Sequence, residues 1–346
     1  MSMHPVQLGR SGLRVSPMCL GTMMFGGTAD LPTARRIADR CLDAGVFFWD
    51  TADMYGKGAS ETVCGSLLKG RRQEVVLATK VFADMGPSVN DRGLSARHIL
   101  SACEASLRRL GTDWIDLYYL HLPDRTVPLA ETLRAMEDLV RSGKVRYIGC
   151  SNYRAWEMVE LIHAARQSGF SEIIAAQPLY NIVNRDIEVE LLPMASRYGL
   201  GVVSYASLAR GVLTGKYTWG GAPPAGSRLA RSDRRFLRAE WRQASVDVAA
   251  ALLPLAEERG CTPGQLATAW AMANQRIHSV IIGPKTLAQA EESLGAASVE
   301  IDADLEAAID ALVPPGSHSG RGWPDDDYYP VTGRVVAPLS RRDDTA

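Results

Sequence analysis

The feature that most limits what this chain can fold into is a regular alternation of short apolar runs with amphipathic helical segments. Apolar runs of four to eight residues between turn residues are typical of strands buried on both faces, and helix-connected strands of this kind form parallel sheets. We expect eight such strands, in MCLGTM (18–23), VFFWD (46–50), EVVLATK (74–80), WIDLYYLHL (114–122), VRYIGCSN (145–152), EIIAAQ (172–177), GLGVVSYA (199–206) and HSVIIG (278–283). Eight strand–helix units favour a closed (β/α)8 TIM barrel over an open doubly wound sheet.

Start and stop signals frame the helices between these strands. Ser95 is a predicted N-cap and Gly111 a predicted C-terminal stop for the helix after the third strand. The next helix is predicted between Pro128 and Gly143. The apolar residues that we expect on one face of the first of these helices are Ile99, Leu100, Cys103 and Leu107.

The chain reads as one domain over residues 1–346, because no linker-like stretch divides it. Its barrel core is expected at about residues 6–312. Residues 215–235 are rich in Gly, Pro and Arg, and they predict a long loop on the active face. Residues 314–346 predict an irregular C-terminal extension. Long irregular segments in compact domains are usually functional or disordered.

Composition narrows the possible partners and compartments. Lys and Arg total 38 against 39 Asp and Glu, so there is no basic excess of the kind that recruits nucleic acid or an anionic membrane. No run of about 18 apolar residues predicts membrane insertion, and the N-terminus has no apolar signal region. The six cysteines are scattered without a C-x-x-C pair, which favours a reducing cytoplasm over a disulfide framework or a zinc site.

The strand ends carry the polar residues of greatest interest, because the carboxyl ends of the strands hold the active site in barrels of this kind. The second strand ends at Asp50 with Tyr55 just beyond, the third at Lys80 and the fourth at His121. Taken singly, each has an ordinary structural explanation: a loop carboxylate, a solvated lysine, loop packing or a core histidine. Four such residues from three consecutive strands on one rim favour a catalytic site.

These four residue types suit the reduction of a carbonyl. Hydride addition creates an alkoxide that needs a proton donor, and a free tyrosine, with a pKa of about 10, donates reluctantly. A unit charge 4 Å away contributes roughly 4 kcal/mol at an effective dielectric of about 20, enough to lower a pKa by one to three units. We therefore expect Lys80 to lower the pKa of Tyr55, Asp50 to hold Lys80, and His121 to orient the substrate oxygen.

The motifs on these strand ends resemble those of the aldo-keto reductases. DTADMYGKGASE, ATK, LHLPD, GKVRYIGCSN, AQPLYN and SYASLARGVLTGKY stand in the family's order and spacing, and the resemblance covers roughly residues 6–312. The sequence is most similar to the bacterial branch related to the β-subunits of voltage-gated potassium channels. The resemblance implies a barrel with an N-terminal β-hairpin, NADPH over the carboxyl rim, and Tyr55 as general acid assisted by Asp50, Lys80 and His121. The channel subunits carry Asn at the position of His121, so the reductase set is complete in this chain.

The resemblance also implies cofactor contacts. Thr22, Met23 and Asp50 would lie beside the cofactor, Ser151, Asn152 and Gln177 would bind the nicotinamide carboxamide, and Tyr205 would stack on the nicotinamide ring. Leu208, Arg210, Lys216 and Arg228 would surround the pyrophosphate; the adenine-end loop would supply Gly283, Lys285, Thr286, Gln289, Glu292 and Ser293. Lys285 and Thr286 favour a 2′-phosphate, and so NADPH over NADH. Ser293 departs from the Asn usual at its position.

The expected reaction is the NADPH-dependent reduction of an aldehyde or ketone, with a small carbonyl compound as partner. One alternative is a cofactor-binding regulatory subunit of a membrane protein, as the channel branch suggests. A metal-dependent hydrolase using Asp50, Asp53 and His121 is disfavoured, since the strand ends lack paired histidines such as H-x-H.

Substrate residues are expected among the apolar neighbours of the catalytic positions. The predicted pocket mouth consists of Met24, Phe25, Met54, Phe82 and Leu122. Four aromatic residues of the irregular segments could fold over it: Trp219, Trp323, Tyr328 and Tyr329. No cluster of spare cations predicts a phosphorylated substrate, although Arg125 follows LHLPD closely enough to approach the rim.

Overall fold

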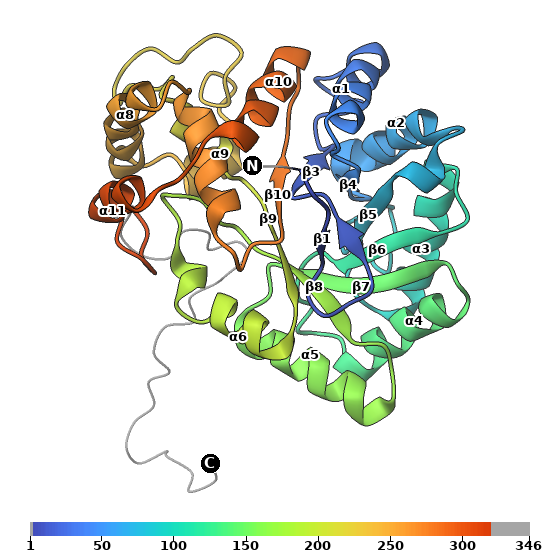
Figure 1. Cartoon of the computed structure of the whole chain (residues 1–346). Helices are drawn as coiled ribbons and strands as arrows, with labels where there is room; N and C mark the ends of the chain where they lie inside the picture. Colours follow the sequence, from blue (N-terminus) through green and yellow to red (C-terminus); the bar gives the residue numbers. More distant parts are fainter. Residues whose placement is uncertain (1–2, 320–346) are drawn as a thin grey trace, which may run out of the picture.

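A computed structural model describes residues 3–319 of the chain. Eight parallel strands close into a barrel in the order β10-β3-β4-β5-β6-β7-β8-β9 (Figure 1), which confirms the predicted (β/α)8 fold. The strands are β3 (Met18–Gly21), β4 (Phe48–Asp50), β5 (Val76–Val81), β6 (Ile115–Leu120), β7 (Val145–Ser151), β8 (Ile173–Gln177), β9 (Gly201–Ser204) and β10 (Ser279–Ile282). Each lies within the apolar run that predicted it or ends one residue beyond it.

Helices surround the barrel. They are α1 (Leu31–Asp43), α2 (Ala59–Leu68), α3 (Ala96–Leu110), α4 (Leu129–Arg141), α5 (Ala155–Ser168), α6 (Leu191–Tyr198), α7 (Arg234–Ala239), α8 (Gln243–Glu258), α9 (Pro263–Ala273), α10 (Leu287–Gly295) and α11 (Ala303–Leu312). Short 3₁₀ segments occur at Tyr55–Gly58, Arg72–Glu74, Asp186–Glu188, Ala209–Thr214 and Ala296–Ser298. Within residues 3–319, no helix has the length and apolar character needed to cross a bilayer.

The caps predicted for α3 are confirmed, but its predicted buried face is wrong at one position. The Ser95 side chain accepts a hydrogen bond from the His98 backbone, and Gly111 ends the helix with a φ of 61°. Ile99, Cys103 and Leu107 are buried, whereas Leu100 is 37% exposed. Successive helical residues are rotated by about 100°, so a residue adjacent to Ile99 points away from the face that Ile99 shares with Cys103.

The barrel interior is filled at its amino-terminal end and polar at its carboxyl end. A buried cluster inside the strands consists of Leu8, Val15, Cys19, Phe48, Ala78, Leu117, Tyr119, Ala175 and Val203. A larger cluster lies between the strands and the helices and includes Trp49, Leu77 and Tyr118. Because side chains alternate between the two faces of a strand, the neighbours of each inner residue face the helices.

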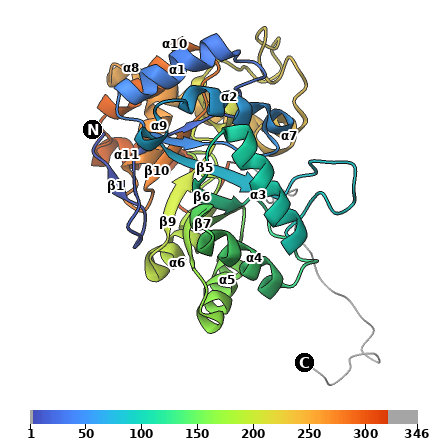
Figure 2. The same ribbon diagram turned by 90° about the vertical axis from the view of Figure 1, so that its right-hand side faces the viewer.

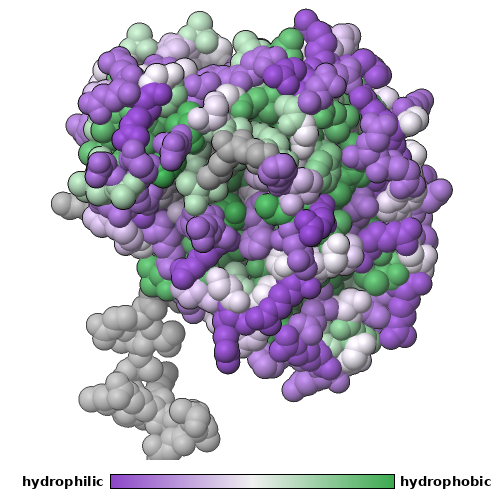
Figure 3. All heavy atoms as spheres, viewed as in Figure 1, coloured by the Kyte–Doolittle hydropathy of each residue, from purple (hydrophilic) through white to green (hydrophobic). Residues whose placement is uncertain are grey.

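An N-terminal hairpin closes the amino-terminal end, as the family resemblance implied. It pairs β1 (Val6–Gln7) with β2 (Arg14–Val15), and the Arg10 backbone donates to the Gly199 carbonyl at 2.8 Å. A Cβ atom on Gly201 would lie 2.4 Å from Leu8 Cδ1, so glycine is needed for the hairpin to pack this closely. The hairpin and α7 lie at opposite ends of the barrel (Figure 2). On the hairpin face, hydrophobic residues gather toward the centre of the view and hydrophilic residues cover the surrounding helices (Figure 3).

Candidate functional site

The alternation of side chains along the strands determines which polar residues enter the barrel. Asp50 follows the inner residue Phe48 by two positions, Lys80 follows Ala78, and His121 follows Tyr119. Gln177 follows Ala175 and Tyr205 follows Val203 in the same way. With a period of two, each of these polar side chains faces the barrel axis one layer above the apolar cluster.

Asp50, Lys80 and Tyr55 form a connected group on this layer. The Lys80 ammonium donates to Asp50 Oδ1, to the Thr51 carbonyl at 2.7 Å and to the Tyr55 hydroxyl at 3.2 Å. The Lys80 side chain is fully buried, and the other Asp50 oxygen accepts a hydrogen bond from Gln177 Nε2 at 2.8 Å. The ammonium is therefore held against both the carboxylate and the phenol.

His121 faces Tyr55 across the same layer. The two rings meet edge to face with centroids 6.1 Å apart, and both residues line the cavity described below. Burial, and then the Lys80 charge, hold the pKa of His121 well below its usual value. The imidazole is therefore neutral at physiological pH.

Lys80 lowers the pKa of Tyr55, as the sequence predicted, but the net shift of this pKa is upward. Burial is the largest effect and raises the pKa of Tyr55, and the Asp50 charge acts in the same direction; Lys80 opposes both but does not outweigh them. Burial alone would lower the pKa of Lys80, but Asp50 and Tyr55 together raise it. Tyr55 is therefore a protonated phenol beside a permanent cation.

The residues predicted to bind the carboxamide form a hydrogen-bonded chain beside this group. Tyr205 donates to Asn152 Oδ1 at 2.7 Å, and Asn152 Nδ2 donates to the His121 carbonyl and to Ser151 Oγ, both at 3.0 Å. Ser151 Oγ donates to the Gln177 carbonyl at 2.8 Å. Side chains at the ends of β7 and β9 thus support one another and are held by backbone carbonyls at the ends of β6 and β8.

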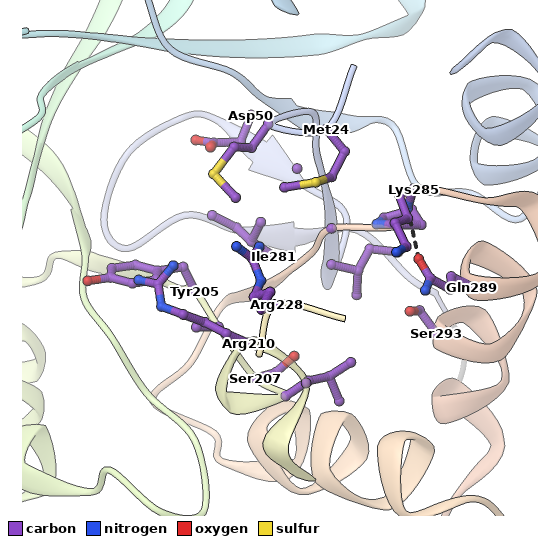
Figure 4. A pocket seen from close by; sticks show the side chains of 18 of the residues that line it. Met24, Asp50, Tyr205, Ser207, Arg210, Arg228, Ile281, Lys285, Gln289 and Ser293 are labelled. Carbon is purple, nitrogen blue, oxygen red and sulfur yellow. Dashed lines mark hydrogen bonds between the residues drawn. The ribbon is translucent and has the colours of Figure 1, made fainter. Parts of the chain in front are cut away.

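An elongated cavity of 550 Å³ extends from this group along the carboxyl rim. In Figure 4, Tyr205 lies on one side of it and Lys285, Gln289 and Ser293 lie on the other. The predicted residues that line the cavity are Met23, Met24, Asp50, Met54, Tyr55, His121, Ser151, Asn152, Gln177, Tyr205, Leu208, Arg210, Lys216, Arg228, Gly283, Lys285, Gln289, Glu292 and Ser293. Lys80 does not line it, because it lies beneath Asp50 and Tyr55.

Some predicted cofactor residues have other roles. The Thr22 hydroxyl donates to the Asp50 carbonyl at 3.0 Å from beneath the cavity. The Thr286 hydroxyl accepts from the Gln289 backbone and so caps α10. Neither is among the residues that line the cavity, so we expect the Thr22 side chain not to contact a cofactor and the Thr286 hydroxyl not to bind a 2′-phosphate directly.

Several predicted substrate residues are also placed elsewhere. Phe25, Phe82 and Leu122 do not line the cavity, and Phe25 is buried in the core between strands and helices. Arg125 does not supply a cation to the rim, because Glu157 binds it at 2.6 Å. Trp219 stacks on Trp241 with centroids 5.0 Å apart. Trp323, Tyr328 and Tyr329 lie outside the described residues.

Four charged residues at the site were not predicted from the sequence. Arg235, at the start of α7, lines the cavity together with Arg231 and Asp233. Glu240 is fully buried; one carboxylate oxygen lies 3.9 Å from Arg210 Nε, and the other accepts from Asn184 Nδ2 at 3.0 Å. The arginine-rich end of segment 215–235 was the available signal for Arg235, and the structure confirms that this segment lies on the active face.

A buried acidic cluster lies behind the loop that carries Tyr55. Glu61 accepts hydrogen bonds from Thr79 Oγ1 and Arg109 Nε, both at 2.6 Å. Asp53 is fully buried, and within residues 3–319 neither of its carboxylate oxygens has a hydrogen-bond partner of good geometry. Burial, and then the Glu61 charge, raise the pKa of Asp53 to about 7.

The described residues contain no group of side chains arranged to bind a metal ion. Among residues 3–319, no three His, Cys, Asp or Glu side chains are grouped closely enough to hold a metal ion. All six cysteines are free, and five of them are buried.

Comparison with known proteins identifies the family. Residues 17–314 match the model of the aldo/keto reductase family. The chain belongs to the aldo/keto reductase family. It is 39% identical over 333 residues to "Uncharacterized oxidoreductase YrpG" of Bacillus subtilis, covering 93% of this chain and 99% of that protein.

Other relatives of this aldo/keto reductase family member carry the names of channel subunits. It is 38% identical over 300 residues to "Probable voltage-gated potassium channel subunit beta" of Arabidopsis thaliana, covering 84% of this chain and 90% of that protein. A "Putative voltage-gated potassium channel subunit beta" of Schizosaccharomyces pombe is 36% identical, covering 84% of this chain and 86% of that protein. The family and the oxidoreductase relative support an oxidoreductase role for this chain.

Proposed function

We propose that this protein reduces an aldehyde or ketone to the alcohol by hydride transfer from NADPH, with Tyr55 as the general acid. The observation that carries the proposal is the group at the cavity end, where the Tyr55 hydroxyl accepts a hydrogen bond from the buried Lys80 ammonium and faces the neutral ring of His121. A phenol and an imidazole directed at one point suit a carbonyl oxygen that gains charge as it is reduced.

The protein residues divide the work as follows. His121, being neutral, donates a hydrogen bond to the substrate oxygen and orients it. Tyr55 transfers its proton to the same oxygen as negative charge develops there. Lys80 stabilises the phenolate that remains, because a cation in a buried site interacts more strongly than in water. Asp50 keeps Lys80 in position and balances its charge before substrate binds.

The cavity has the features that a nicotinamide dinucleotide requires. Its lining combines a polar end at Ser151, Asn152 and Gln177 with a cationic end at Lys216 and Lys285. The backbone has positive φ at Ala209, Arg210 and Gly211, and the last two of these residues line the cavity. When bound, the cofactor supplies the hydride, which no side chain can provide.

Cations at the far end favour NADPH over NADH. Lys285 lies on the loop before α10, and Gln289 Oε1 holds its backbone N–H at 3.0 Å. An ammonium here would pair with a 2′-phosphate. Loss of the charge in Lys285→Met is expected to weaken NADPH binding by roughly ten- to hundredfold, the worth of a charge-assisted hydrogen bond, with little effect on NADH. Equal losses for both cofactors, measured by fluorescence titration, would remove Lys285 from this role.

The central test follows NADPH consumption with a panel of aldehydes, ketones, quinones and keto-sugars. Tyr55→Phe removes only the hydroxyl, so we expect cofactor binding to persist and turnover to fall by at least the 10²-fold typical of a lost general acid. The matched control is Tyr198→Phe, which makes the same substitution at a residue that does not line the cavity. Full turnover by Tyr55→Phe would refute the assignment of the acid.

A second candidate is a cofactor-binding regulatory subunit of a membrane protein, which the names of the plant and yeast relatives favour. Tight NADPH binding without reduction of any carbonyl on the panel would support it. Turnover that depends on Tyr55 would support the enzyme instead.

A further inference from the structure

Tyr55, the proposed general acid, lies on a turn with an unusual backbone. The 3₁₀ segment Tyr55–Gly58 joins β4 to α2, and Gly56, Lys57 and Gly58 in it have φ values of 57°, 52° and 90°. A residue with a side chain, such as Lys57, adopts this left-handed conformation at a cost, so it persists only where the surrounding structure holds it. The backbone N–H groups of Tyr55 and Lys57 bond to carbonyls three residues back. Because these bonds are local, the position of the turn depends on what packs behind it.

Arg109 of α3 packs directly against the end of this turn. A Cβ atom placed on Gly58 would lie 2.6 Å from Arg109 Cδ and 2.8 Å from its Nε, so the arginine side chain contacts the Gly58 backbone. α2 and α3 lie side by side (Figure 2). They approach so closely that a Cβ on Gly65 would lie 2.6 Å from the Arg109 carbonyl oxygen. The turn therefore has no room to shift toward α3.

Glu61 joins Arg109 to the strand that carries Lys80. Glu61 lies in the first turn of α2, directly after the turn of Tyr55, and its side chain is fully buried. One carboxylate oxygen accepts from Arg109 Nε and the other from Thr79 Oγ1, both at 2.6 Å. Thr79 precedes Lys80 on β5, and Lys80 donates to the Tyr55 hydroxyl at 3.2 Å. The Arg109–Glu61 pair therefore connects the turn of Tyr55 to the strand of Lys80.

The two charges make this connection from outside the cavity. Within residues 3–319, neither Glu61 nor Arg109 is among the residues that line it. Since Lys80 faces the barrel axis, its neighbour Thr79 faces the helices, and the pair lies with it on the outer side of the strands. Neither charge can contact a substrate there. Any effect of the pair on catalysis must therefore pass through the turn that it holds.

We propose that Arg109 and Glu61 are positioning residues for the general acid: they hold the turn so that the Tyr55 hydroxyl stays within hydrogen-bonding reach of Lys80. The inference rests on the proposed reduction and identifies what keeps its proton donor aligned. Replacing a buried ion pair by apolar residues is often neutral for stability, so the single geometry that the pair enforces is its distinctive contribution. A misplacement of about 1 Å at a reacting group can cost a factor on the order of 100 in rate.

The test separates positioning from stability with a double variant. Arg109→Met with Glu61→Gln removes both charges, and the new amide oxygen can still accept from Thr79, so the protein should remain folded. The matched control is Arg72→Met with Asp116→Asn, which removes another arginine–carboxylate pair at 2.6 Å, near the amino ends of β5 and β6. Arg109→Lys is a milder variant that keeps the cation but lacks the fork of donors. Each protein is assayed with NADPH and the carbonyl compound of the panel that the wild type reduces fastest.

We expect kcat of the Arg109/Glu61 double variant to fall roughly ten- to hundredfold, while its dissociation constant for NADPH stays within about twofold of wild type. The solvent isotope effect on kcat should rise, because proton transfer from Tyr55 becomes the slow step. Independently of turnover, the backbone amides of residues 55–58 should exchange with D2O roughly tenfold faster, since the turn opens more often. Arg109→Lys should lie between wild type and the double variant, and the control variant should match wild type in all three measurements.

Two results would overturn the inference. One is a wild-type kcat, or unchanged amide exchange at residues 55–58, in the double variant, or in Arg109→Lys should the double variant not fold. The other is an equal change in the Arg72/Asp116 control, which would tie the effect to overall stability. Turnover that is lost in Tyr55→Phe would leave the proposed function intact in either case. Failure of the wild type to reduce any carbonyl compound of the panel would instead refute the proposed function, and this inference with it.

Discussion

The buried carboxyl of Asp53 should make the stability of this protein fall as the pH rises through neutrality. Asp53 lies in the loop between Asp50 and Tyr55, is fully buried, and has a folded-state pKa raised from 3.8 to about 7 by burial and by Glu61. In the unfolded chain the group ionises near its ordinary pKa. Between the two values the folded state holds a proton that the unfolded state has lost, so stability decreases with pH.

The magnitude follows from the two pKa values. At about 1.36 kcal/mol per unit, the whole shift corresponds to about 4 kcal/mol, lost progressively between pH 4 and pH 7 and constant above. Between pH 5 and pH 8 the expected loss is about 2.6 kcal/mol. The Asp53→Asn variant cannot ionise, so it should lack this decline and be more stable relative to wild type at pH 8 than at pH 5 by that amount.

The assay is urea unfolding at pH 5, 6, 7 and 8, with refolding checked at each pH. The difference between variant and wild type cancels other titrating groups, and Asp43→Asn, at an exposed position, controls for the loss of one charge. Profiles for Asp53→Asn and wild type that run parallel from pH 5 to pH 8 would refute the reasoning. They would mean that Asp53 ionises with a nearly normal pKa despite its burial.

Three further substitutions test other parts of the structure. Arg109→Met leaves the fully buried Glu61 without its cation and should lower the free energy of urea unfolding by about 3 to 5 kcal/mol. Adding Glu61→Gln removes the unpaired charge, so the double variant should recover much of that loss. Equal losses in the single and the double variant would contradict a buried ion pair. Lys80→Met should destabilise the protein by about 3 to 5 kcal/mol, because it leaves Asp50 unpaired, and it should also abolish turnover. Adding Asp50→Asn should restore stability but not turnover. Recovery of both stability and turnover would show that the ammonium only balances charge. Gly201→Ala forces a methyl group against the hairpin and should lower the free energy of unfolding by about 1 to 3 kcal/mol. The strain lies at the opposite end of the barrel from the site, so kcat of the folded protein should not change. A changed kcat would show that the two ends are coupled.

The fold could be predicted from the sequence because one pattern, a short apolar run followed by a helical segment, is repeated along the chain. Each strand is a short apolar run, and eight of them with helical connections leave few architectures other than a barrel. The same period of two placed Asp50, Lys80 and His121 on the inner face of their strands, two residues beyond Phe48, Ala78 and Tyr119. Local pattern therefore predicted both the barrel and the juxtaposition of these side chains.

Local sequence patterns did not predict which side chains from distant segments contact one another. Phe25 stands next to Met24 in sequence, yet the first is buried in the core and the second lines the cavity. Arg125 follows a strand end, but Glu157, 32 residues away, binds it. The pairing partner of a charged side chain depends on which elements pack against it, and a single sequence contains no measure of that packing.

The sequence by itself determined the (β/α)8 fold and the strand ends that carry Asp50, Lys80 and His121, because each strand is a short apolar run that stops at these polar residues. The structure then showed that all three face the barrel axis. Only the tertiary structure decided how those groups ionise. Burial raises the pKa of Tyr55 against the pull of Lys80 and raises that of Asp53 to about 7. Tertiary packing also brought Arg235 of α7 to the wall of the cavity. Desolvation and charge proximity are properties of the assembled three-dimensional site, so they appear only once distant segments have come together.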